Sequence, residues 1–352
     1  MGDTLTSPER DPERDRGGDG RGAGGRGEPG APGLPVVRDA VRRVLTRLFG
    51  PPPFDPNRDP GDPGLTGPDS PSWRVIGEPA AIAGGIRGLL TQVSHPLAMA
   101  GVFDHSAFRE DPLGRLQRTS AYVTTSTFGS TAEAIAVAGR VRAVHPRVVG
   151  TAPDGRPYRA DDPRLLVWVS IALTSSFLTA HRLWAPDVLT PAEEDRFVAE
   201  QSRIGALLDP EVDLRMLRDA TTRDAFRAGE LDGELRLIGP DMLPMSSRQL
   251  DDVLASFHSE IGINFQGRDA MSFLRWPPIP KVARGGYQSL LLGAIGSLTP
   301  ELRHALELDR TTRLAPAMRA QAAMTLRVMR LTTGTSPSMR AAHARAGATP
   351  AI

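Results

Sequence analysis

Histidine is the side chain best suited to bind a metal in this chain of 352 residues, which contains seven histidines and no cysteine. His145 is the most informative of them, because it lies at helical spacing from Val141 and Val148 and its ring should point toward the interior with them. A neutral imidazole on an apolar helix face can ligate haem iron, and Pro146 would distort the helix beside it. A packed core histidine with satisfied nitrogens fits the same spacing, so both interpretations stay open.

A pair of polar residues lies on the helix predicted before the one that holds His145. Arg115 and Thr119 are four residues apart and share one helix face, and Tyr122 lies close to that face. In a pocket, the guanidinium could hold a propionate or polarise bound dioxygen, and the hydroxyl could fix its orientation. A solvated face with a surface arginine explains the spacing equally well. The pair is therefore a candidate site without an assignment.

Other histidines have simpler explanations. His95 precedes Pro96 at a junction between helices, where we expect its ring to make a structural hydrogen bond to a helix end. Glu301 and His304 form one E-x-x-H, the unit that di-iron carboxylate bundles use in two copies, and an acid in the first turn of a helix explains Glu301 better. The motifs of zinc proteases, serine hydrolases, phosphate-binding loops and dinucleotide-binding folds do not occur in the sequence.

The composition restricts the chemistry further. Without cysteine, the chain cannot form disulfides, iron–sulfur clusters, thiolate-ligated haem or a cysteine nucleophile. Its 42 basic and 41 acidic residues give a net charge of +1, so we expect no concentrated basic surface for nucleic acid or an anionic membrane. Lys281 is the one lysine, and the abundance of Ala, Gly and Pro indicates G+C-rich bacterial coding.

The first part of the chain differs in composition from the rest. Residues 1–72 hold 14 of the 36 Gly and 13 of the 32 Pro, so this segment is predicted to be mostly disordered. One short amphipathic helix is expected over residues 36–49, either lying on the domain or binding a membrane surface. We expect a helical domain over residues 73–335 and a flexible tail over residues 336–352.

Within residues 73–335, start and stop signals recur about every 20 residues and predict an all-α fold. Asp154-Gly155 predicts a small hairpin. Helices are expected to begin near Pro79, Pro96, Asp111-Pro112, Thr131, Asp162-Pro163 and Thr190-Pro191, and further helices near residues 211–227, 247–261, 284–297, 300–308 and 316–331.

The most apolar of these helices extends over residues 165–180. Its uncharged stretch is shorter than the roughly 20 apolar residues of a membrane span, so we expect a buried helix and no span. The N-terminus lacks the apolar region of a secretory signal. The expected location is therefore the cytoplasm.

Several segments, taken in order, resemble a known enzyme family. SWRVIGEPAAIAGGIRGLLTQVSHPLAMAGVFDHSAFREDPLGRLQRT from Ser72, then VRAVHPRVVGT, DDPRLLVWV, LTPAEEDRFVAE and FLRWPPIP, are similar to the catalytic domain of rubber oxygenases (latex-clearing proteins) and mycophenolic-acid-pathway oxygenases. The resemblance covers about residues 73–335. It implies a globin-like helical core with additional helices, a b-type haem and an oxygenase activity.

Site residues carry over from this resemblance one by one. His145 corresponds to the histidine that ligates the haem iron, and Arg115 and Thr119 correspond to an arginine and a threonine on the other side of the haem. Latex-clearing members have a lysine just before that threonine. Here Arg118 occupies the place, where it stays protonated and cannot ligate iron but remains a catalytic candidate. Trp168-Val169 is followed by Ser170 where many members have a histidine.

These departures favour a substrate other than rubber, because a polymer outside the cell would also require an exported enzyme. The expected function is a cytoplasmic haem b oxygenase that uses dioxygen on a small lipophilic substrate, such as an isoprenoid or an alkene. Two alternatives remain open. One is a helical protein that binds haem or an apolar ligand without turnover, and the other is a helical bundle with no cofactor.

Overall fold

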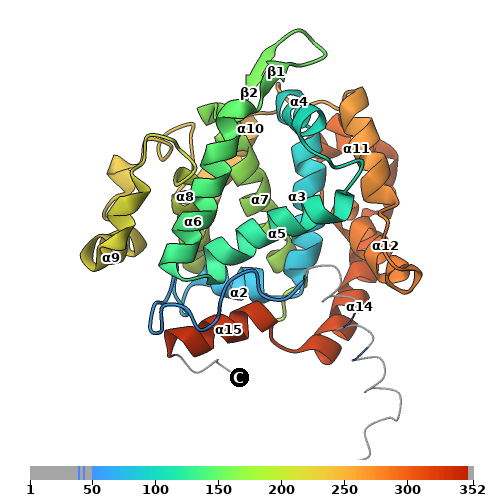
Figure 1. The fold of residues 1–352 in the computed structure, drawn as a ribbon. Coiled ribbons are helices and arrows are strands. Elements are labelled where there is room, and N and C mark those ends of the chain that lie inside the picture. Colours follow the sequence, from blue (N-terminus) through green and yellow to red (C-terminus); the bar gives the residue numbers. More distant parts are fainter. Residues whose placement is uncertain (1–38, 40–42, 44–49, 348–352) are drawn as a thin grey trace, which may run out of the picture.

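The structure is a computed structural model that describes Asp39, Arg43 and residues 50–347, and this part of the chain is mainly helical (Figure 1). The all-α class predicted from the sequence is confirmed, whereas the globin-like arrangement stays a prediction. The predicted helix over residues 36–49 falls outside the described residues, apart from Asp39 and Arg43. The α-helices that the structure describes are α2 (Pro71–Gly77), α3 (Ala80–Val93), α4 (Pro96–His105), α5 (Pro112–Phe128), α6 (Thr131–Val144), α7 (Pro163–Trp184), α8 (Pro191–Ala206), α9 (Ala220–Ala228), α10 (Ser247–Ser256), α11 (Phe265–Arg275), α12 (Lys281–Gly296), α13 (Pro300–Ala305), α14 (Ala315–Thr333) and α15 (Pro337–Ala346).

Short elements connect these helices. The 3-10 helices are η1 (His145–Arg147), η2 (Leu214–Arg218), η3 (Asp232–Glu234) and η4 (Asp309–Leu314). Strands β1 (Val149–Thr151) and β2 (Pro157–Arg159) pair antiparallel, which confirms the hairpin predicted at Asp154-Gly155. Gly155 has a φ of 85°, a conformation that glycine adopts without strain.

The central layer of the fold is the pair α3 and α7, with α12 on the other side of α3 and α14 packed on α12 (Figure 1). Two glycines allow α3 and α7 to approach closely. A Cβ at Gly84 would lie 2.9 Å from the Phe177 ring, and a Cβ at Gly88 would lie 2.9 Å from the Leu173 side chain. A larger residue at Gly84 would push the helices apart, because the Phe177 Cα also lies within 3.1 Å, whereas at Gly88 the Leu173 side chain would have to move.

Helix α7 begins where the sequence predicts. Asp162 accepts hydrogen bonds from the backbone N–H groups of Arg164 and Leu165, and Pro163 occupies the first helical position. Among the described residues, α7 alone is long and apolar enough to cross a membrane, and 67% of its most apolar window is buried inside the protein. That degree of burial is typical of a core helix.

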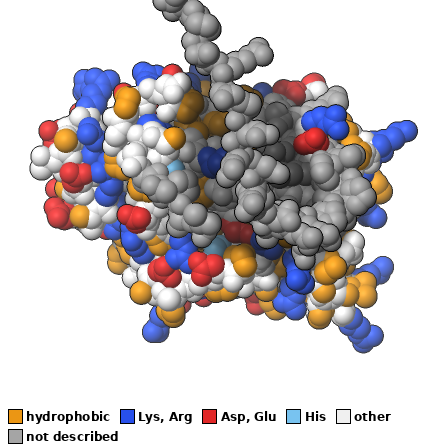
Figure 2. Space-filling model, turned by 90° about the horizontal axis from the view of Figure 1, so that it is seen from below, with side chains coloured by type: hydrophobic (Ala, Val, Ile, Leu, Met, Phe, Trp, Pro, Cys, Tyr) orange, Lys and Arg blue, Asp and Glu red, His pale blue; other side chains and the backbone are white. Residues whose placement is uncertain are grey.

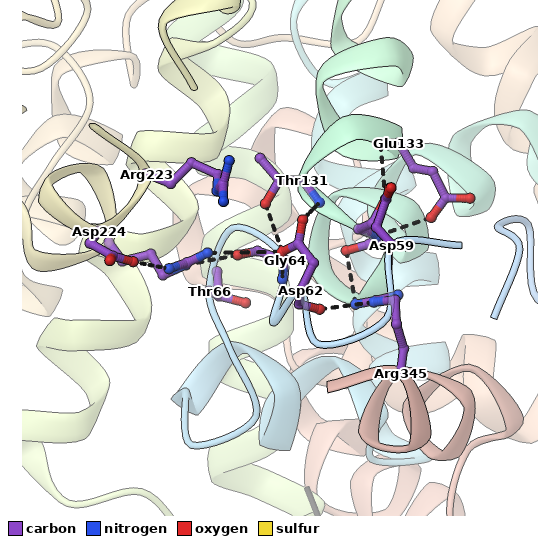
Figure 3. Close-up of polar contacts among 12 residues, drawn as sticks. Asp59, Asp62, Gly64, Thr66, Thr131, Glu133, Arg223, Asp224 and Arg345 are labelled. Carbon is purple, nitrogen blue, oxygen red and sulfur yellow. Dashed lines mark hydrogen bonds and ion pairs between the residues drawn. The ribbon is translucent and has the colours of Figure 1, made fainter. Parts of the chain in front are cut away.

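Residues 50–72 correct the expected boundary of the folded region. Phe54 and Leu65 are buried, so this segment packs on the domain, whereas the predicted disordered segment extended to residue 72. Side-chain hydrogen bonds replace regular structure here. Asp62 accepts from Gly64 N–H at 2.7 Å and from the Thr131 hydroxyl at 2.9 Å (Figure 3). Gly and Pro prevent a helix in this segment, but they do not prevent such contacts.

The predicted flexible tail is also corrected, since residues 337–346 form α15. Arg345 in α15 donates from Nε to the Asp62 carbonyl at 3.0 Å and from a terminal nitrogen to the Gly129 carbonyl at 3.1 Å. His343 packs edge-on against Trp73, with ring centroids 4.9 Å apart. These contacts join α15 to residues 59–64 and to the α5–α6 turn. We refer to Asp59, Asp62, Gly64, Gly129, Thr131 and Arg345 together as the Asp62 network (Figure 3).

Charged side chains are mixed on the described part of the face seen from below. Basic and acidic groups lie beside one another there, with apolar side chains between them (Figure 2). The described part of this face carries no continuous patch of one sign.

Candidate functional site

The residues singled out from the sequence lie on α5, on α6 and just beyond α6. The two helices meet at Gly129 and Ser130 and diverge from that turn, so the start of α5 and the end of α6 lie at the open side (Figure 1). Ser130 and Glu133 form a capping box that starts α6. Arg115, near the start of α5, and His145, after the end of α6, therefore lie toward the far ends of two diverging helices.

The middle of α5 has few close protein neighbours. This helix packs mainly on α6, α2 and α15 rather than on α3 or α7. Its last residues, Thr125–Phe128, are buried, but Leu113, Leu116 and Val123 are only half-buried. Apolar side chains at the centre of a domain are normally buried by neighbouring elements. This face of α5 is therefore able to contact an apolar ligand.

Arg115 is held by a neighbouring helix end. Its guanidinium donates to the Ser106 hydroxyl at 2.7 Å, and Ser106 lies directly after α4. Burial lowers the pKa of Arg115, and the nearby positive charge of Arg118 lowers it further. The remaining N–H groups of this half-buried cation are suited to bind an anion or a polarised oxygen.

Thr119 and Tyr122 lie on the same part of α5. The Thr119 hydroxyl donates to the Arg115 carbonyl at 3.1 Å, so its lone pairs remain able to accept a hydrogen bond. Burial raises the pKa of Tyr122, although the hydrogen bond with Ser126 acts in the opposite direction. The phenol therefore stays neutral near pH 7 and serves as a polar group in an apolar setting.

Arg118 occupies a different environment from Arg115 and Thr119. Its side chain is 64% exposed and lies 3.3 Å from the carboxylate of Asp111, the N-cap residue of α5. An exposed pair of this kind contributes little to stability. The position gives no support to the catalytic role predicted for Arg118, which stays a prediction.

His145 lies where α6 changes into the 3-10 turn η1, because Pro146 cannot continue the α-helical hydrogen bonding. The ring is half-buried, and its Nδ1 atom is buried without a hydrogen-bond partner. Burial lowers the pKa of His145, and the Asp161 carboxylate acts in the opposite direction. The imidazole is thus neutral near pH 7. Both ring nitrogens of the buried His181 and His343 also lack a hydrogen-bond partner, so the core-histidine interpretation and the haem-ligand interpretation both stay open.

Two other histidines behave as the sequence indicated. His95 is fully buried, and its Nδ1 accepts a hydrogen bond from the backbone of Ala98, which caps α4. The His304 side chain of the E-x-x-H is 84% exposed. Within residues 50–347, no group of three or more His, Asp or Glu side chains is arranged to hold a metal ion by itself.

Sequence reasoning did not single out Arg87 in α3, one of several buried charged residues. Its side chain is only 2% exposed. A signal was available, because Arg87 is the one charged residue between Ala80 and Val93. An isolated arginine in an otherwise apolar helix either reaches the surface or meets a polar partner inside.

Comparison with known proteins places the chain in a family. Residues 73–331 match the family described as "ER-bound oxygenase mpaB/B'/Rubber oxygenase, catalytic domain". The chain belongs to this family. Its matched region is an oxygenase catalytic domain, as the sequence resemblance predicted.

Two mycobacterial proteins are similar to this chain, and both are uncharacterized. One is from Mycobacterium bovis and the other from Mycobacterium tuberculosis. Each is 25% identical over 215 residues, which span 61% of this chain and 71% of the relative. No solved structure matches the chain.

Proposed function

We propose that this protein is a b-type haem-dependent oxygenase that acts on a small lipophilic substrate. Family membership supports the oxygenase class. The single observation that carries the haem assignment is that His145, directly after α6, is a neutral imidazole whose buried Nδ1 atom has no hydrogen-bond partner. A neutral histidine next to an apolar helix face meets the requirement of a haem axial ligand.

Three residues would hold the cofactor. His145 would ligate the iron, and Arg115 and Thr119 would face the haem from α5. Haem, when bound, supplies the iron that reacts with dioxygen. Because burial lowers the pKa of His145, its ring needs no deprotonation before it binds metal at pH 7.

Arg115 would act as the charged group beside the reacting molecules. Ser106 fixes the orientation of the Arg115 guanidinium through one hydrogen bond. The direction of the other N–H groups is set by this contact. A pre-oriented cation in a partly buried site stabilises developing negative charge better than a mobile surface arginine does. Thr119 would accept a hydrogen bond at a fixed position on the same face, because its own proton is donated to the Arg115 carbonyl.

The substrate class follows from the apolar surroundings. Leu116 and Val123 on α5 and Val169 and Leu173 on α7 are half-buried apolar side chains. As the wall of a substrate site, these side chains would favour a hydrocarbon-rich molecule and would exclude water from the reaction. Isoprenoids and alkenes are the substrates to test first.

Absorption spectra of the purified protein, oxidised and reduced, together with a pyridine haemochrome assay, test the cofactor assignment. We expect near-stoichiometric b-type haem in the wild type and its loss in His145→Ala. The matched control is His258→Ala, since His258 is exposed and is not a candidate ligand. Full haem content with an unchanged spectrum in His145→Ala would remove His145 from the site.

Oxygen uptake with a panel of alkenes separates catalysis from binding. We expect Arg115→Gln to retain haem and to lower oxygen uptake about 100-fold, the usual loss for one pre-oriented donor. Stable haem without oxygen uptake on any substrate, or with added peroxide, would instead favour a haem-binding protein. Colourless protein after haem-supplemented expression would favour the cofactor-free bundle.

A further inference from the structure

Arg87 is a buried cation with almost no protein partner. It lies on α3 where this helix contacts α7, and one terminal nitrogen, Nη1, donates to the Ser176 hydroxyl at 2.9 Å. Its Nε atom is buried without a hydrogen-bond partner. No carboxylate among the described residues forms an ion pair with it, and burial is the one cause that lowers the pKa of Arg87, to about 10. The guanidinium is therefore charged at pH 7.

The free groups of Arg87 have a definite geometry. Nη1 is occupied by Ser176, whereas Nε is unpaired and Nη2 forms no hydrogen bond to the residues that the structure describes. These two nitrogens form one edge of the planar guanidinium, and a carboxylate binds such an edge through two parallel hydrogen bonds.

Ser176 fixes this orientation. Its hydroxyl donates to the Ala172 carbonyl at 2.6 Å, so the Ser176 oxygen can only accept from Arg87. The neighbouring Gly88 keeps α3 close to Ser176 and Leu173 on α7. The guanidinium is thus held at the contact between the two central helices, with its Nε–Nη2 edge unused.

Leaving such an edge unused inside a protein is costly. A buried charge without a counter-charge costs several kcal/mol, so natural proteins pair it or use it. The buried Arg303 also has an unpartnered Nε atom, but both of its terminal nitrogens donate, to the Thr312 hydroxyl and the Leu298 carbonyl, whereas Arg87 uses one.

We propose that Arg87, oriented by Ser176, binds the carboxylate of a molecule held in the interior through its Nε–Nη2 edge. The carboxylate has two possible sources, a haem propionate or an acidic group on a lipophilic substrate. The first source rests on the proposed function, whereas the second does not require haem.

The propionate source is tested with haem and haem dimethyl ester, whose propionates carry no charge. Affinity is measured by titration and by the rate of haem transfer to apomyoglobin. We expect the wild type to bind the ester at least about 10-fold more weakly than haem, as for loss of a charge-assisted pair. Arg87→Gln should bind the two equally.

The substrate source is tested with haem-free protein and two probes of equal chain length, octanoate and octanol. Octanoate should raise the melting temperature of the wild type and not that of Arg87→Gln. Octanol should change the melting temperatures of the two proteins by the same amount. Arg303→Gln is the matched control and should retain the wild-type preference in both experiments. Should Arg87→Gln fail to fold, Arg87→Lys replaces it in both experiments, because lysine keeps the charge but has no planar edge for two parallel hydrogen bonds.

Each outcome has one meaning. Discrimination against the ester that is lost in Arg87→Gln assigns Arg87 to a propionate. Discrimination for octanoate alone that is lost in Arg87→Gln assigns it to a substrate carboxylate. Equal binding within both pairs overturns the proposal even if haem binds well. Absence of haem binding contradicts the proposed function, and the octanoate experiment still tests Arg87 by itself.

Discussion

Arg345 and Arg87 are both almost fully buried, at 4% and 2% exposed, but their surroundings differ. Arg345 donates to two backbone carbonyls, and three carboxylates, those of Asp62, Glu133 and Asp59, oppose the lowering of its pKa by burial. Arg87 has one hydroxyl partner and no such carboxylate. The first charge is used within the fold, and the second is left for something that binds.

Removal of the charge should therefore affect stability differently at the two positions. Arg345→Gln should lower the free energy of unfolding by about 3 kcal/mol, because it leaves the Asp62 and Gly129 carbonyls without their donor and removes the cation beside the carboxylates of the Asp62 network. Urea unfolding measures this loss. Arg340 lies on the same helix but is exposed. The control Arg340→Gln should therefore change the free energy of unfolding by no more than about 0.5 kcal/mol. Equal effects of the two variants would show that the network does not stabilise α15.

Replacement of Arg87 by an apolar residue of similar volume is the second comparison. In haem-free protein, Arg87→Met should leave the free energy of unfolding unchanged or raise it by about 1 kcal/mol, because it removes an uncompensated buried charge. Urea unfolding of the haem-free wild type and variant gives the difference. A loss of more than about 2 kcal/mol would mean that the fold itself uses the charge, and the contrast with Arg345 would fail.

Local signals in the sequence were sufficient for most helix starts. Asp162-Pro163 and Thr190-Pro191 begin α7 and α8 as predicted, because an N-cap and a proline act within one turn. Residues 211–227 were expected to form one helix, but Asp219 caps a new helix there and divides the segment into η2 and α9. Helix α11 was not predicted.

Long-range contacts account for what the sequence could not reveal. The order of residues 50–72 and of α15 depends on Asp62 and Arg345, which are far apart in the chain, and no local pattern reports such a bond. His145 and Arg115 were proposed as site residues because helical spacing marks a face, and these assignments stay predictions. Arg87 was missed because the absence of a partner is a property of the tertiary structure, although its isolation in an apolar helix was visible.

Acid should weaken the region of the Asp62 network through His343, the smallest of the three effects. His343 is 5% exposed, and neither ring nitrogen has a hydrogen-bond partner. Burial lowers its pKa below the usual 6.5, and Asp69 opposes this. Because the unfolded chain then binds the proton more readily, the contribution of His343 to stability is complete above pH 6.5 and decreases as the pH falls below that value.

The test compares the free energy of unfolding at pH 7.5 and pH 5.5, two values on either side of about 6.5. His343→Phe keeps an aromatic ring against Trp73 but cannot be protonated, so its loss of stability between the two pH values should be smaller than that of the wild type. Part of the loss should persist, since burial also lowers the pKa of His95 and His181. His258→Gln, at an exposed position, should behave as the wild type does. An identical loss in His343→Phe and the wild type would show that α15 stays docked on Trp73 when His343 is protonated, and the acid sensitivity would then have to arise in the interior around α3 and α7.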